Sequence, residues 1–185
     1  MFTQFKFLIE DLKRWKPVSF EDALYTLCEQ GLWATIFYRL NRSLFLINIP
    51  IIKIFIRIIN FIIFKFSEIA LGISLSPGAS IGPGFYIGHT GVIVIHPDVK
   101  AGKKLSLGQL VTIGTRGVGY TGAPTIGDNV YIGVGAKILG NIKIGSDVKI
   151  GANAVVISDI PDNTTAVGIP AKVVKRNDLK IDKGL

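Results

Sequence analysis

Few side chains in this sequence can act as an acid, a base or a metal ligand near neutral pH. The chain has two histidines, His89 and His96, and a single cysteine, Cys28. One cysteine excludes a disulfide framework and a cysteine-based zinc site, and two histidines exclude most multi-histidine metal chemistry within one chain. The sequence therefore predicts no metal site.

His89 is the strongest candidate for proton transfer. It stands in the sequence GHTG, two residues after an aliphatic position that is predicted to point inward. Histidine is the side chain best suited to accept a proton near neutral pH, so His89 is a candidate general base. His96, in the sequence IHPD, either lines the same cleft or lies at a solvent-exposed corner, and the second placement is favoured.

The composition is that of a folded chain with a cationic surface. The 185 residues are 49% hydrophobic and 18% charged, and the formal net charge is +8. These values exclude a disordered or collagen-like chain and predict one domain with a modest second element. The charge permits contact with nucleic acid, a membrane surface or a phosphorylated ligand. No nucleic-acid reading motif is present, so a nucleic-acid partner is not predicted.

The composition changes near Gly72. Residues 1–72 hold 14 of the 18 aromatic residues but only 2 of the 21 glycines. Since glycine weakens helices and marks turns, the change predicts a helical region over 1–72 and a different fold after it. We assign the second domain to residues 73–171, with a loop at 114–125, and a C-terminal tail to 172–185.

Two helices are predicted in the first region. Residues 21–40 have apolar positions at helical spacing, with Ser19 as a candidate N-cap. Residues 51–66 are far more apolar, but Lys53, Arg57 and Lys65 disfavour a membrane-spanning helix. Two interpretations of this helix stay open: burial against a partner subunit, or contact with anionic lipid. Residues 1–10 lack the basic start and cleavage site of a signal peptide.

The second region carries a six-residue repeat of aliphatic side chains. Thirteen positions follow one frame, interrupted once: Leu75, Ile81, Ile87, Ile93, Val99, Leu105, Val111, Ile126, Ile132, Ile138, Ile144, Ile150 and Val156. A six-residue unit is a short strand plus a turn with one inward side chain, and three units close a triangular coil of 18 residues. The sequence therefore predicts a mainly β protein, a parallel β-helix preceded by helices.

The stretches IGPGFYIGHTGVIVIHP, VTIGT, PTIGDNVYIGVGAKILGNIKIGSDVKIGANAVV and AVGIPAKVV resemble the hexapeptide-repeat acyltransferases. Within them, the sequence is most similar to the serine acetyltransferase-like branch, which includes enzymes of polysaccharide gene clusters. The resemblance implies a left-handed β-helix, homotrimers with active sites between adjacent β-helices, and acetyl-CoA as the donor. It also suggests a dimer of trimers formed through the N-terminal helices.

The resemblance implies roles for particular residues. His89 aligns with the family's catalytic histidine, and Ser74 stands where serine acetyltransferases have the aspartate that orients it; Glu68 is a weak alternative. Gly88 and the pair Gly122–Ala123 stand where those enzymes bind the amino acid through charged side chains. Unpaired buried charges are costly, so this departure disfavours free serine and favours a sugar hydroxyl.

The remaining predicted site residues fall into two sets. The loop at 114–125 is predicted to line the acceptor site, with Arg116 and Tyr120, together with His96 and Ser74, as acceptor-binding residues. The donor set implied by the resemblance consists of Val134, Gly135, Ala136, Lys149, Ala152, Ser158, Lys172 and Lys175. The glycine and alanine positions leave room for the pantetheine arm, and the lysines could meet phosphates. No ATP-binding loop is present.

The function favoured by these residues is direct transfer of acetyl from acetyl-CoA to a hydroxyl of a saccharide or glycolipid precursor. The predicted location is cytoplasmic, with contact at the inner face of the membrane. The alternative enzyme is serine O-acetyltransferase of cysteine biosynthesis, and transfer to an amino sugar is a third reading. A non-enzyme alternative is a trimeric scaffold that presents basic helices to a membrane.

Overall fold

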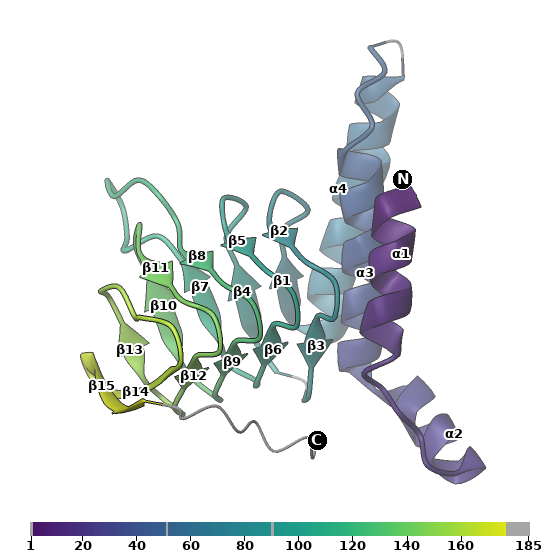
Figure 1. Ribbon diagram of the computed structural model, residues 1–185. Coiled ribbons are helices and arrows are strands. Elements are labelled where there is room, and N and C mark those ends of the chain that lie inside the picture. The colour runs from purple at the N-terminus through teal and green to yellow at the C-terminus, as the bar shows by residue number, and fades with distance from the viewer. Residues whose placement is uncertain (1, 51, 90, 177–185) are drawn as a thin grey trace.

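The computed structural model describes residues 2–50, 52–89 and 91–176, and it consists of four helices followed by a β-helix (Figure 1). The helices are α1 (Phe2–Leu12), α2 (Phe20–Cys28), α3 (Gln30–Phe45) and α4 (Lys53–Leu71). Within the described residues, no helix is both long enough and apolar enough to cross a membrane.

The single helix predicted over residues 21–40 is two helices in the structure. Ser19 caps α2 through a capping box with Asp22, as the sequence indicates, but Glu29 has extended backbone angles and ends the helix. Gly31 then lies so close to the β-helix that an added Cβ would be 2.3 Å from the Ile87 carbonyl oxygen. The break lets α3 pack on the β-helix while α2 extends away from it (Figure 1).

The predicted helix over 51–66 is α4, which begins at Lys53 and continues to Leu71. Gly72 ends it in the left-handed conformation, with φ of +66°, and the first strand begins at Ile73. Ile51, the predicted first residue of this helix, lies outside the described residues.

The strands form three sheets, which are the three faces of the β-helix. Sheet A contains β1 (Ile73–Leu75), β4 (Ile93–Ile95), β7 (Thr112–Gly114), β10 (Lys137–Leu139) and β13 (Val155–Val156). Sheet B contains β2 (Ser80–Ile81), β5 (Lys100–Ala101), β8 (Thr125–Ile126) and β11 (Lys143–Ile144). Sheet C contains β3 (Tyr86–Ile87), β6 (Ser106–Leu107), β9 (Tyr131–Ile132), β12 (Lys149–Ile150), β14 (Thr164–Gly168) and β15 (Ala171–Arg176).

All neighbouring strands are parallel except β14 and β15, which form an antiparallel pair at the C-terminal end. The predicted mainly β fold, a β-helix preceded by helices, is therefore confirmed. β15 crosses the boundary predicted at residue 171, and residues 177–185 of the predicted tail lie outside the described part of the chain.

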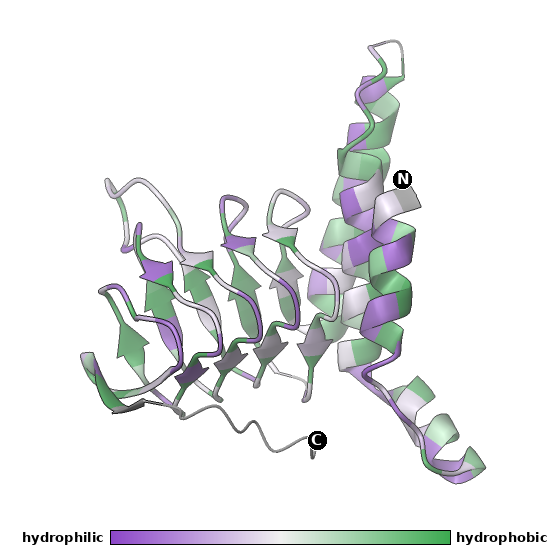
Figure 2. Cartoon of the chain, in the orientation of Figure 1, coloured by the Kyte–Doolittle hydropathy of each residue, from purple (hydrophilic) through white to green (hydrophobic). Residues whose placement is uncertain are grey.

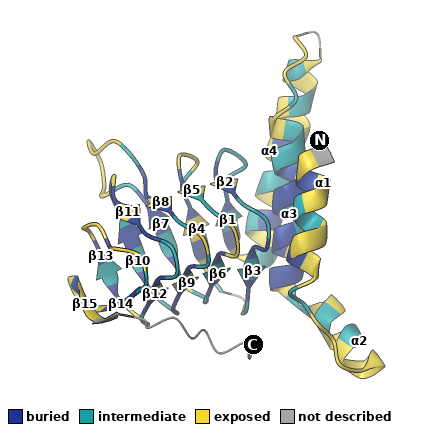
Figure 3. Ribbon diagram, viewed as in Figure 1, coloured by how far each residue is buried: buried dark blue, intermediate teal, exposed yellow. Residues whose placement is uncertain are grey.

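All thirteen aliphatic residues of the six-residue frame are buried (Figure 3). The sequence predicted one inward side chain per unit, but most units have two. Phe85 and Ile87 both point inward in one unit, and Leu105 and Leu107 do so in the unit stacked on it. The inward residues stack from coil to coil in columns, such as Ile87, Leu107, Ile132 and Ile150.

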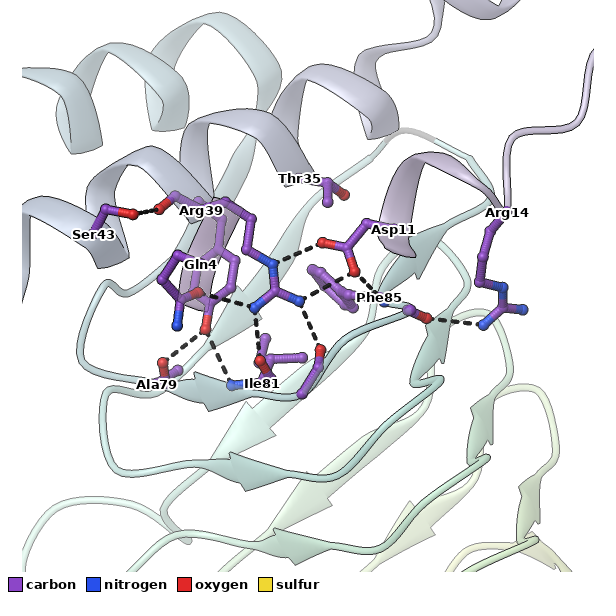
Figure 4. A network of polar contacts seen from close by, with 12 residues as sticks. Gln4, Asp11, Arg14, Thr35, Arg39, Ser43, Ala79, Ile81 and Phe85 are labelled. Atoms are coloured by element: carbon purple, nitrogen blue, oxygen red, sulfur yellow. Dashed lines mark hydrogen bonds and ion pairs between the residues drawn. The ribbon is translucent and has the colours of Figure 1, made fainter. Parts of the chain in front are cut away.

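The helices close the open end of the β-helix through a buried polar cluster (Figure 4). Arg39 is 1% exposed and donates to the Asp11 carboxylate at 2.7 Å, to the Ile81 carbonyl at 2.7 Å and to the Gly82 carbonyl at 2.6 Å. Asp11 in turn accepts from the Phe85 amide at 2.8 Å. Burial raises the pKa of Asp11, while Arg39 and the Phe85 amide act in the opposite direction.

Candidate functional site

Two corners of the β-helix are longer than the six-residue repeat requires. The first lies between β3 and β4: Ile95 stacks on Leu75, so this coil is 20 residues long instead of 18. The second lies between β7 and β8 and contains the predicted loop. His89 lies in the first long corner, and Arg116 and Tyr120 lie in the second. Both long corners therefore contain predicted site residues.

The six-residue frame hides the first of these insertions. Ile93 fits the frame six residues after Ile87, but it pairs with Ile73 and occupies the other inward position of its unit. The frame continues because both inward positions are apolar, so counting apolar residues could not reveal the two extra residues. The signal available in the sequence was the local pattern around His89, which has Gly88 before it and Gly91 two residues after it.

The two long corners lie on different edges of the triangular β-helix. We call the edge between sheets C and A the histidine edge; it contains residues 88–89, 91–92, 108–111, 133–136 and 151–154. We call the edge between sheets A and B the loop edge; it contains residues 76–79, 96–99, 115–124, 140–142 and 157–159. Sheet A separates them, and a three-residue strand is about 10 Å long.

His89 is exposed on the histidine edge, and no hydrogen bond from its side chain is found within the described residues. Thr90, the next residue of the GHTG sequence, lies outside the described residues. Gly91 has a φ of +143° and stacks on the following coil, where a Cβ added to it would lie 3.0 Å from the Gln109 Cβ. An exposed imidazole at a corner is free to approach a bound molecule.

Four predicted donor residues share this edge with His89: Val134, Gly135, Ala136 and Ala152. Tight stacking continues along it: an added Cβ at Gly108 would lie 2.7 Å from the Val134 amide nitrogen, and one at Gly133 would lie 2.8 Å from that of Ala152. Gly135 has a φ of +73°. The Ala136 side chain is fully buried in the core, so it does not face outward. The glycines therefore let successive coils stack closely along this edge.

The other predicted donor residues lie elsewhere. Lys149 is exposed on the outer face of sheet C, and Lys172 is exposed on β15 at the end of the same sheet. Ser158 is exposed on the loop edge. Lys175 pairs with Thr165 in the backbone register of β14 and β15, and its side chain lies outside the described part of the structure. The structure thus brings Lys149 and Lys172 to one sheet but leaves Ser158 apart from them.

The predicted acceptor residues, with one exception, lie on the loop edge. The guanidinium of Arg116 donates to the Ile157 carbonyl, and its side chain lies against Gly140. Tyr120 is 63% exposed. His96 lies at a corner of this edge and is half-buried, and the Asp98 amide donates to its Nδ1 at 3.3 Å. His89 and His96 are consequently on different edges of one chain.

Ser74 is the exception, because it lies on β1 of sheet A. Its outward side chain forms a hydrogen bond with Glu68 of α4, and Glu68 also pairs with Lys65 at 2.5 Å. The bond from Lys65, followed by that from Ser74, lowers the pKa of Glu68. The two residues considered as orienting partners of His89 are thus joined to each other, and no contact of either with His89 is found within the described residues.

A cleft of about 820 Å³ lies over sheet B, beside the loop edge. It is lined by Arg42, Ser80, Lys100, Thr125 and Asn141, and by Gly122 and Ala123 at the base of the loop. His89 does not line it. Among the described residues, no group of three or more histidine, cysteine or acidic side chains could hold a metal ion.

Comparisons with known proteins agree with this architecture. The family model "Bacterial transferase hexapeptide (six repeats)" matches residues 123–158. A serine acetyltransferase of Synechococcus elongatus is 36% identical over 158 residues, which are 84% of this chain and 62% of that protein. This chain therefore spans about three-fifths of the length of that curated relative.

Solved structures extend the comparison to the whole fold. Neisseria gonorrhoeae serine acetyltransferase matches with a TM-score of 0.81 and 34% identity, over 96% of this chain and 68% of that one. A serine acetyltransferase in complex with CoA matches with a TM-score of 0.76 and 28% identity, over 93% of this chain and 70% of that one. The chain belongs to the hexapeptide-repeat acyltransferases. Within this family it falls in the serine acetyltransferase-like branch, as the residue pattern predicted.

Proposed function

We propose that this protein is an acetyl-CoA-dependent O-acetyltransferase whose active site forms between two copies of the chain in a homotrimer. The observation that carries the proposal is the placement of the candidate residues on two edges. Within one chain, sheet A separates His89 from Arg116 and Tyr120. Packing the histidine edge of one copy against the loop edge of another would bring the two sets together, and three copies close such a head-to-tail arrangement into a ring.

His89 is the general base in this proposal. Its imidazole accepts the proton of the acceptor hydroxyl as the oxygen attacks the thioester carbonyl. The tetrahedral intermediate collapses, the carbon–sulfur bond breaks, and the CoA sulfur receives the proton from the imidazolium. The acetyl group passes directly from CoA to the acceptor oxygen, and no acyl-enzyme forms.

The donor is proposed to lie along the histidine edge. The small residues Gly135 and Ala152 leave room for the pantetheine arm beside exposed backbone, and the exposed Lys149 and Lys172 supply charge for phosphates. The serine acetyltransferase solved with CoA supports this choice of donor, since it shares the fold over 93% of this chain.

L-Serine is the first candidate acceptor, because the relatives found are named serine acetyltransferases. They support serine better than they support the saccharide that the residue pattern favours, and they give no support to a role in polysaccharide biosynthesis. A saccharide hydroxyl remains the second candidate for one specific reason. Gly88, Gly122 and Ala123 provide no charged side chain for the ammonium and carboxylate groups of an amino acid.

Release of free thiol from acetyl-CoA, measured with L-serine and with a panel of saccharides, tests both candidates. We expect turnover with a hydroxyl acceptor, and we expect His89→Ala to lower kcat by about 10²–10⁴-fold while CoA binding, measured by calorimetry, is retained. Undiminished turnover in His89→Ala would refute the base assignment. Absence of thiol release with serine and with every saccharide would refute the proposed activity.

A further inference from the structure

The outer face of α4 is mostly apolar, with Lys65 as an exposed charged residue within it. Eight large side chains of this helix are each at least half exposed: Ile54, Phe55, Ile58, Ile59, Phe61, Ile62, Phe66 and Ile69. Most of them recur at spacings of three or four residues, which places them on one face. The opposite face packs on α3, where the buried Asn60 donates to the Asn41 carbonyl at 2.7 Å. These eight side chains stay exposed among the described residues of the single chain, and the visible part of α4 is largely hydrophobic in Figure 2.

The patch continues to the tip of the α3–α4 hairpin, which extends beyond the β-helix (Figure 1). Phe45, Leu46, Ile49 and Ile52 are between 43% and 54% exposed there. The largest apolar patch on a soluble monomer is about 300–600 Å². Twelve large apolar side chains that are each 43–84% exposed make a patch of the kind that marks an interaction site.

The charges beside this patch are positive. α4 carries Lys53, Arg57 and Lys65, and its one acidic residue, Glu68, is already paired with Lys65 at 2.5 Å. In the described part of the chain, Arg57 has no hydrogen bond or ion pair. An apolar helix face bordered by cations matches the interface of a bilayer that contains anionic lipid, where each basic residue near the surface adds about 1 kcal/mol.

The same charges disfavour a second copy of α4 as the occupant. Consider two copies of α4 that are related by a twofold axis and cross at Phe61 in antiparallel orientation. Arg57 and Lys65 both lie four residues from Phe61, so Arg57 of one copy would lie opposite Lys65 of the other. Like charges placed opposite each other across an interface are unfavourable. Anionic headgroups carry the complementary charge instead.

We infer that the outer face of α4 binds the surface of a membrane that contains anionic lipid, with the helix lying in the plane of the interface. Ile54, Ile58, Ile62 and Phe66 would enter the boundary between headgroups and acyl chains, while Arg57, at the border of this face, contacts the headgroups. This inference does not depend on the proposed acetyl transfer, because it uses none of the residues on the histidine or loop edges.

Co-sedimentation of the full chain with vesicles tests the inference. We expect binding to phosphatidylcholine vesicles that contain phosphatidylglycerol, little binding to pure phosphatidylcholine, and weakening by salt. The double variant Ile58→Gln/Ile62→Gln should lose at least about tenfold in affinity, since two buried aliphatic side chains contribute several kcal/mol. Arg57→Gln should weaken binding to anionic vesicles alone.

Val18→Gln is the matched control. Val18 is 95% exposed in the segment before α2, away from the hairpin tip, so its loss should leave vesicle binding unchanged. Equal thermal unfolding of all variants would show that each is folded. Failure of the wild type to bind anionic vesicles would overturn the inference, as would equal binding by the double variant. If the wild type binds no vesicle and forms a larger oligomer than the double variant, the occupant is a second copy.

Discussion

The β-helix and the helical region use their apolar residues in opposite ways. In the β-helix, all thirteen repeat positions are buried and stack in columns of like residues. In the helical region, α2 buries none of its residues, and α4 buries only the polar residues Asn60 and Ser67. The β-helix thus supplies its own core, whereas α2 and α4 leave most of their apolar side chains exposed, and α3 joins the two regions through buried residues such as Ala34, Tyr38 and Arg39.

Loss of the Arg39 contacts is expected to have the largest effect on stability. Asp11→Asn removes the counter-charge of Arg39, which is 1% exposed and hydrogen-bonded between the two regions. Breaking a buried ion pair by removing one partner costs about 3–5 kcal/mol. Urea unfolding should show a loss of that size, with the helices melting before the β-helix. Glu10→Gln, on the same helix but exposed, should change the free energy of unfolding by less than about 1 kcal/mol.

A matched pair of isoleucine substitutions compares the two regions directly. Ile132 is fully buried between Leu107 and Ile150, so Ile132→Ala should lower the free energy of unfolding by about 2–5 kcal/mol. Ile58 is 51% exposed on α4, and Ile58→Ala should stay within about 0.5 kcal/mol in the absence of a binding partner. Similar losses in the two variants would mean that the outer face of α4 is covered in solution.

The junction between the two regions gives the smallest predicted effect. Lys65 and Ser74 lower the pKa of Glu68 below its ordinary 4.5. The two contacts therefore stabilise the fold fully above pH 4.5. Their contribution is lost as the pH falls through the lowered pKa that Glu68 has in the folded state. Glu68→Gln should cost about 0.2–1 kcal/mol at neutral pH, because the pair is partly exposed. The difference between wild type and variant should vanish in acid. A difference that grows as pH falls would contradict this assignment.

The sequence predicted the fold from one periodic signal. Six-residue spacing determines a stacked coil because no single unit can bury its own apolar residue, and every residue of that frame is indeed inside. The helix boundaries were less predictable. The break at Glu29 depends on the contact of Gly31 with Ile87, which lies 56 positions further along the chain. Local spacing carries no information about such a contact.

For the candidate site, the sequence alone determined which residue types are available: one histidine between glycines, a glycine-rich loop and small residues at the donor positions. Only the tertiary structure decided where they lie. The two extra residues at the His89 corner kept the apolar frame intact, so spacing could not reveal the insertion. Which edge of the β-helix a corner occupies depends on how the strands stack, and stacking places His89 and the loop on separate edges. The apolar face of α4 has the same origin, since a helical pattern predicts an apolar face but not whether another part of the chain covers it.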